Sequence, residues 1–128
     1  MEENEIVKMI KIIIDYQVKS FKKLFYYCDC ISSICFKKFN RINITDMSFM
    51  FNGCSSLKEL NLINFNSNKV TNMNCLFYEC SSLKELNHNN FNTNNVTDMR
   101  CMFGRCLDEL QLKIKSQFKI FEEEAFDD

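Results

Sequence analysis

The 128-residue sequence contains no proline, no tryptophan, one histidine and two glycines. Because Gly53 and Gly104 stand far apart, the chain has no glycine-rich loop that could hold a phosphate group. A cysteine–histidine nucleophile pair would have to use His88, which occupies a position of the strand pattern described below. We therefore predict a protein that is not an enzyme, with no catalytic residue and no cofactor.

The chain also lacks a long hydrophobic run and an excess of charge. No segment reaches the ~18–20 unbroken apolar residues of a membrane span, and the net charge is −1. So small a charge would attract neither nucleic acid nor an acidic membrane. Residues 1–5 are acidic where a secretory signal is basic, and two lysines interrupt the apolar run at 6–14. These absences predict no nucleic-acid partner, no membrane insertion and a cytoplasmic location.

What the chain does contain is a 26-residue repeat. Residues 47–72 and 73–98 align without a gap and are identical at 16 of 26 positions. The period continues into a degenerate copy before them and a shortened copy after them. Such a period is typical of one small unit stacked on copies of itself. The sequence predicts a single domain with an N-terminal cap at 1–17, four repeats at 18–112, and a C-terminal helical cap with an acidic tail at 113–128.

The first half of each copy has apolar residues at helical spacing. In the second copy these residues are Met47, Met50, Phe51 and Cys54. The spacing i, i+3, i+4, i+7 marks one face of a two-turn helix. Thr45 or Asp46 just before it is of the N-cap type, able to accept hydrogen bonds from unpaired amides. The pattern predicts one short helix in each copy, stable only through packing on its neighbours.

The second half of each copy alternates as a strand does. Leu60 and Leu62 point to one side, and the residues between them point to the other. His88 replaces Leu62 in the third copy, and the fourth copy is two residues shorter. The fold class we predict is an α/β repeat, a leucine-rich-repeat-type solenoid of about four 26-residue units. Short parallel strands would form one face and short helices the other, with caps at both ends.

The full sequence of the copies is more specific than the Leu-x-x-Leu-x-Leu pattern of leucine-rich repeats. Residues 54–62 read Cys-Ser-Ser-Leu-Lys-Glu-Leu-Asn-Leu, followed by Asn-Phe-Asn-Ser-Asn-Lys-Val-Thr-Asn-Met. This sequence resembles the BspA-like leucine-rich repeats, a type of 26-residue repeat found in surface proteins. The resemblance covers about residues 18–112. The resemblance implies a cell-surface protein concerned with adhesion and with binding host or matrix proteins.

Eight cysteines in so short a chain would ordinarily suggest disulfides. Most of them, however, follow the repeat. Cys28, Cys54, Cys80 and Cys106 share one position, and Cys75 and Cys101 share another, which holds Phe49 in the second copy. A position shared with phenylalanine is a packing position. We interpret these residues as buried free thiols, with disulfides as the alternative.

The outward strand positions form the candidate binding site. They are Ser33, Cys35, Glu59, Asn61, Ile63, Glu85, Asn87, Asn89, Glu109 and Gln111. We predict a monomeric, non-catalytic interaction module that binds a protein partner on this face, although an ordinary solvated surface would look the same. One alternative is a fragment or degenerate copy of a larger surface adhesin. Another is a minor metal or redox role through Cys30, Cys35 and His88.

Overall fold

The computed structural model describes residues 11, 18–37, 43–86, 92–117 and 121–128. In chain order its elements are strand β1 (Ser33–Cys35), strand β2 (Glu59–Asn61), helix α1 (Asp108–Gln117) and the 3₁₀ helix η1 (Glu123–Phe126). Apart from residue 11, the predicted N-terminal cap lies outside the described residues. Its apolar run at 6–14, for which the sequence leaves both a helix and a short strand open, lies there too.

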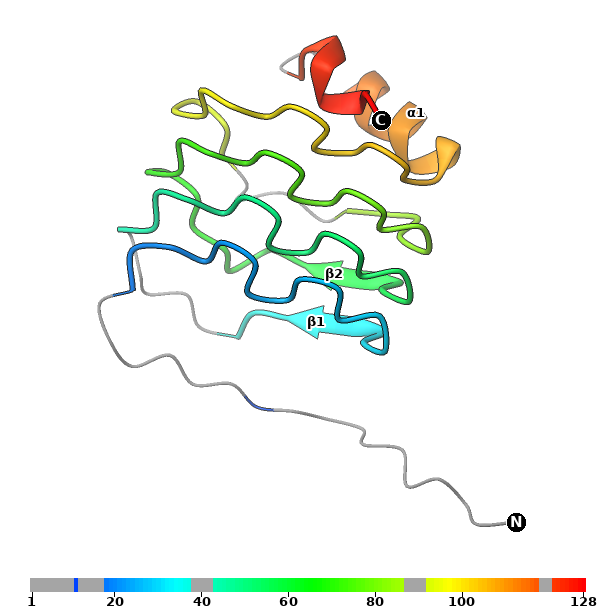
Figure 1. The fold of residues 1–128 in the computed structure, drawn as a ribbon, viewed down its shortest axis with the longest axis horizontal. Helices are drawn as coiled ribbons and strands as arrows, with labels where there is room; N and C mark the ends of the chain where they lie inside the picture. The colour runs from blue at the N-terminus through cyan, green and yellow to red at the C-terminus, as the bar shows by residue number, and fades with distance from the viewer. Residues whose placement is uncertain (1–10, 12–17, 38–42, 87–91, 118–120) are drawn as a thin grey trace.

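Neighbouring copies of the repeat run side by side, as Figure 1 shows. Strands β1 and β2 pair in parallel, with Ser33 opposite Glu59 and Cys35 opposite Asn61. Isolated parallel bridges join Ser20 to Asp46, Asp46 to Asn72 and Asn72 to Asp98. Every one of these pairs is separated by 26 residues. The predicted register, in which equivalent residues of successive copies face each other, is confirmed at these positions.

The predicted solenoid of four strand–helix units is wrong. The described residues contain only two strands of three residues each. Their single α-helix follows the repeats instead of alternating with the strands. The shortened fourth copy was expected to form a strand near residues 107–112, but α1 begins at Asp108. No repeat within the described residues combines a strand with a helix.

The segments predicted as helices are instead series of tight turns, which form what we call the turn row (residues 21–28, 47–54, 73–80 and 99–106). In the second copy the amides of Met50, Asn52 and Cys54 donate to carbonyls three residues earlier. The amides between them donate to the next copy: Phe49 to Asn74, Phe51 to Leu76 and Gly53 to Tyr78. An α-helix needs every amide to donate four residues back along its own chain. Alternate donation to a neighbour therefore excludes a helix.

Positive φ angles at two positions of each copy make this alternation possible. The positions are Lys23, Phe49, Cys75 and Cys101, and Tyr27, Gly53, Glu79 and Arg105. A residue with a Cβ loses about 1–2 kcal/mol in this region, so the bonds between copies must outweigh the strain. Apolar residues at i, i+3, i+4 and i+7 face one side in the turns as they would in a helix. The helical prediction failed because this spacing is common to both.

Polar residues at the start of each turn segment play the role expected of them. A side-chain oxygen of each accepts from the amide two residues later. The donor–acceptor pairs are Ser48 to Asp46, Asn74 to Asn72 and Arg100 to Asp98, at 2.9, 3.0 and 3.2 Å. The predicted acceptor role of the N-cap residue types is confirmed for these three, although no helix follows them.

A column of stacked phenylalanine rings forms the centre of the core. Ring centroids lie 5.6 Å apart from Phe25 to Phe51, 5.6 Å from Phe51 to Phe77, and 5.5 Å from Phe77 to Phe103. Phe126 of η1 adds a ring 5.6 Å from Phe103. The three middle rings are at most 1 % exposed. The prediction that equivalent side chains lie on top of one another is confirmed for this column.

The shared cysteine position is a packing position, as predicted. Cys54, Cys80 and Cys106 are buried. Their thiols donate to the carbonyls of the phenylalanines 29 residues earlier, at 3.2, 3.1 and 3.1 Å. Burial raises the pKa of Cys54 and of Cys106 to about 12 and that of Cys80 still further. All eight cysteines are free thiols in this structure.

The C-terminal segment continues the turn row beyond the last copy. The amide of Cys101 donates to the carbonyl of Glu124 at 2.8 Å, and that of Phe103 to Ala125 at 2.7 Å. Helix α1 lies beside this end of the molecule and buries Leu110 and Ile114 in the core. The sequence places Ile114 in the predicted C-terminal helical cap, whereas Leu110 lies in the piece for which a strand was expected.

Candidate protein-binding groove

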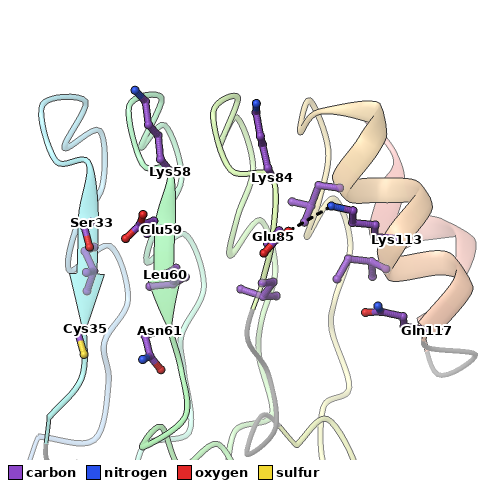
Figure 2. Close-up of a pocket in the computed structure, with 14 residues that line it drawn as sticks. Ser33, Cys35, Lys58, Glu59, Leu60, Asn61, Lys84, Glu85, Lys113 and Gln117 are labelled. Atoms are coloured by element: carbon purple, nitrogen blue, oxygen red, sulfur yellow. Dashed lines mark ion pairs between the residues drawn. The ribbon is translucent and has the colours of Figure 1, made fainter.

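A groove of about 890 Å³ runs across the strand row, by which we mean β1, residues 58–61 (β2 and the lysine before it) and residues 84–86. Helix α1 closes one end of it (Figure 2). The lining residues from the strand row are Ser33, Ile34, Cys35, Lys58, Glu59, Leu60, Asn61, Lys84, Glu85 and Leu86. Those from α1 are Leu110, Lys113, Ile114 and Gln117.

Half of the predicted binding residues line this groove. They are Ser33, Cys35, Glu59, Asn61 and Glu85, all of them exposed. The parallel pairing of β1 with β2 explains their common face, because alternate side chains of paired strands point the same way. Ser33 therefore stands beside Glu59, and Cys35 beside Asn61.

The other predicted residues lie elsewhere. Glu109 and Gln111 belong to α1 and not to a strand, and neither lines the groove. The side chain of Gln111 donates to the carbonyl of Phe103 at 2.9 Å, so it supports the helix. Ile63 follows β2 and does not line the groove. Asn87 and Asn89 lie outside the described residues.

The contribution of α1 to the groove was missed in the sequence. Lys113, Ile114 and Gln117 reach the groove only because α1 turns across the end of the strand row. The spacing of Leu110 and Ile114 indicated an amphipathic helix, which was a usable signal for the element. No pattern indicated which part of the strand row the helix would cover.

Charge is distributed unevenly along the groove. The ammonium group of Lys113 lies 3.1 Å from a carboxylate oxygen of Glu109 and 3.6 Å from one of Glu85. These carboxylates, Glu109 first, raise the pKa of Lys113 above its ordinary value. By contrast, Glu59 and Lys58 form no ion pair with any other described residue. The charges of the groove beside α1 are therefore paired with one another, whereas those of Lys58 and Glu59 are not paired with a described residue.

The base of the groove is apolar and its rim is polar. Leu60 is 4 % exposed, Leu86 is 8 % exposed, and Ile34 is half-buried. Figure 2 shows the side chains of Lys58 and Lys84 along one rim and those of Cys35 and Asn61 toward the opposite one. An apolar base with a polar rim is the usual arrangement of a surface that binds another protein.

The described residues provide no metal centre. They contain no group of three or more histidine, cysteine, aspartate or glutamate side chains that could hold an ion. Cys30 and Cys35 are exposed in the first copy, whereas His88 lies outside the described part of the chain. The metal or redox role suggested for these three residues stays a prediction. In the same described part, no helix has both the length and the apolar character needed to cross a membrane.

The molecule is a repeat protein whose copies pair in register and carry a groove along one row. The model of the family described as "Mycoplasma protein of unknown function, DUF285" matches residues 15–120. The chain belongs to this family. Searches of curated proteins and of solved structures gave no match.

Proposed function

We propose that the protein is a non-catalytic interaction module that binds a protein partner in the groove of the strand row. The observation that carries this proposal is the groove itself, where an apolar base is bordered by charged side chains, of which Lys58 and Glu59 have no ion-pair partner among the described residues. Hydrogen-bonding groups that are exposed and aligned in columns can serve a second polypeptide as well as they serve water.

The shape of the groove favours a polypeptide segment. Neighbouring strands lie about 4.8 Å apart, so β1, β2 and residues 84–86 span about 10 Å before α1 is reached. A short extended segment lying across the strands would contact all three and end against α1. The area covered would be near the lower limit of stable interfaces, so we expect a modest affinity.

The amino-acid sequence of the copies supports a more specific assignment, in which the repeats are of the BspA-like type. The run of residues 54–60 recurs without change at 80–86. We propose on the same basis that the protein acts as a monomer and has no catalytic activity.

Charge reversal at Glu59 provides the test. A lysine at this exposed position on β2 would change the available charge without touching the core. We expect Glu59→Lys to weaken capture of the partner from a lysate of the source organism by about tenfold or more, equivalent to ~1.4 kcal/mol. Capture is measured by quantitative mass spectrometry, with circular dichroism to confirm an unchanged fold. Adding Glu85→Lys should weaken capture further.

Glu122→Lys is the matched control. Glu122 is also an exposed acidic residue, but it precedes η1 and does not line the groove. This variant should capture the partner as the original protein does. If Glu59→Lys with Glu85→Lys retains full capture, or if Glu122→Lys loses it equally, the partner does not bind in this groove.

A further inference from the structure

Two cysteines occupy the same position of neighbouring copies in the turn row. The amide of Cys75 donates to the carbonyl of Arg100 at 3.0 Å, which places the two backbones directly side by side up to Cys101. The bridge between Asn72 and Asp98 fixes the register three residues earlier. Backbones paired in this way lie ~4.8 Å apart. That spacing falls within the ~4.4–6.8 Å that separates the two α-carbons of a disulfide.

The side chains of the two cysteines are also neighbours. Burial, and after it the neighbouring thiol of Cys101, raises the pKa of Cys75 to about 11. The φ angles of the two residues are 51° and 53°, so their side chains leave the backbone in the same direction. Both residues are half-buried, which leaves them within reach of a small reagent in solution.

The other row of cysteines provides an internal contrast. Cys54, Cys80 and Cys106 also occupy equivalent positions of neighbouring copies, but they are fully or almost fully buried. Each of these thiols donates to a phenylalanine carbonyl and not to the next thiol. Spacing alone therefore does not define a reactive pair. Access from solvent, and thiols that are not bonded to a phenylalanine carbonyl, single out Cys75 and Cys101.

We propose that Cys75 and Cys101 form an oxidation site, at which a peroxide converts the two thiols into a disulfide linking the third and fourth copies. In the first step the thiolate of Cys101 attacks a peroxide oxygen and the O–O bond breaks, because the raised pKa of Cys75 disfavours its thiolate. With hydrogen peroxide this gives a sulfenic acid, and the departing hydroxide takes a proton to become water. In the second step the other sulfur attacks the sulfenic sulfur, and the hydroxyl group leaves with a proton as water. Two thiols are oxidised while one hydrogen peroxide is reduced to two waters.

The disulfide would join the repeat at the point where the C-terminal segment is attached. The amide of Cys101 is bonded to Glu124, and that of Phe103 to Ala125. A covalent link through Cys101 would hold the last copy, and with it this segment, against the third copy. We expect the oxidised protein to unfold at a higher temperature than the reduced protein, because the link restricts the conformations of the unfolded chain and so lowers its entropy.

The test is to expose the reduced full chain to equimolar hydrogen peroxide, alkylate it, and digest it with trypsin without a reducing agent. Cleavage after Lys84 and Arg100 separates the two cysteines unless a disulfide joins them. We expect a monomeric product in which six of the eight thiols remain alkylated, eight less the two that are linked. Tandem mass spectrometry should place the link at Cys75 and not at Cys80, which lies in the same peptide.

Cys75→Ser should lose the linked peptide, whereas Cys35→Ser should keep it. Cys35 is an exposed thiol of the strand row and is therefore the matched control. The proposal is overturned if Cys75 and Cys101 are recovered as separately alkylated residues, as higher oxides, or in links to other cysteines. Because these outcomes are read in the original protein, they do not depend on the folding of either variant.

Discussion

The turn row and the strand row run through the same copies, yet only the turn row is regular throughout. In the turn row, alternate amides of each described copy donate to the next, and those of the fourth donate to the C-terminal segment. In the described part of the strand row, paired strands form only in the first two copies, and α1 takes the place of the fourth. The contrast shows that stacking of copies needs one regular row, and that an interrupted second row can form a groove.

The fourth copy is shortened at the point where α1 begins. It lacks two residues after Cys106 relative to the earlier copies. Helix α1 starts there instead, with Asp108 and Glu109 in its first turn, where negative charge is favourable. The helix then covers the end of the row and supplies Lys113 to the groove.

The largest effect should come from removing a ring of the turn row. Phe77 stacks between Phe51 and Phe103 and is fully buried. We expect Phe77→Ala to lower the free energy of unfolding by ~3–5 kcal/mol, because the cavity would lie in the middle of the column. Urea denaturation measures the change.

Leu60→Ala in the strand row is the matched comparison. Leu60 is nearly buried but borders the groove, so its site can relax and the cost should lie near ~2 kcal/mol. An equal loss for Leu60→Ala and Phe77→Ala would show that the two rows contribute alike, contrary to our interpretation.

A smaller effect is expected at Gly104, where the C-terminal segment meets the turn row. A Cβ at Gly104 would collide with the carbonyl oxygen of Asp127, and would lie 2.8 Å from the ring of Tyr78. We expect Gly104→Ala to cost ~1–3 kcal/mol, because backbone on one side cannot easily move away. Hydrogen exchange should also show weaker protection of the Phe103 amide, which bonds to Ala125.

Gly53→Ala is the control within the same row. Its Cβ would meet only the ring of Tyr27, at 2.7 Å, and that ring can turn aside. Its φ of +74° adds strain for any residue with a side chain. We expect destabilisation without any loss of protection at Phe103. Equal exchange at Phe103 in the two variants would contradict the role given to the C-terminal segment.

The smallest effect concerns pH. Hydrogen bonds from Arg100 lower the pKa of Asp98 from 3.8 to about 2. Because the folded pKa is the lower one, the stabilisation is complete above pH 4 and is lost as the pH falls toward 2. The pair is partly exposed, so we expect a contribution of no more than ~1 kcal/mol.

Asp98→Asn tests this prediction and gives the third copy the residue that the second copy has at this position, Asn72. The difference in unfolding free energy between the original protein and Asp98→Asn should be present at pH 6 and absent at pH 2. A difference that stays constant across this range would show that the carboxylate charge has no part in it.

The sequence permitted prediction of the register, the phenylalanine column, the buried cysteines and five of the fourteen residues that line the groove. All of these follow from the 26-residue period, since equivalent residues of paired copies must face each other. It did not permit prediction of the turn row, because the apolar spacing of Met47, Phe51 and Cys54 fits a helix equally well. The side chains that α1 brings to the groove escaped prediction because no local pattern encodes where a helix docks.

The sequence by itself determined which side chains stack, because the period sets their order along the molecule. Only the tertiary structure decided what the backbone does between them. Each alternate amide of the turn row finds its partner in the next copy, 25 residues away for Phe51 and Leu76. A hydrogen bond of that kind competes with helix formation, yet the sequence of a single copy does not reveal it. The groove likewise exists only once α1 lies against the strand row.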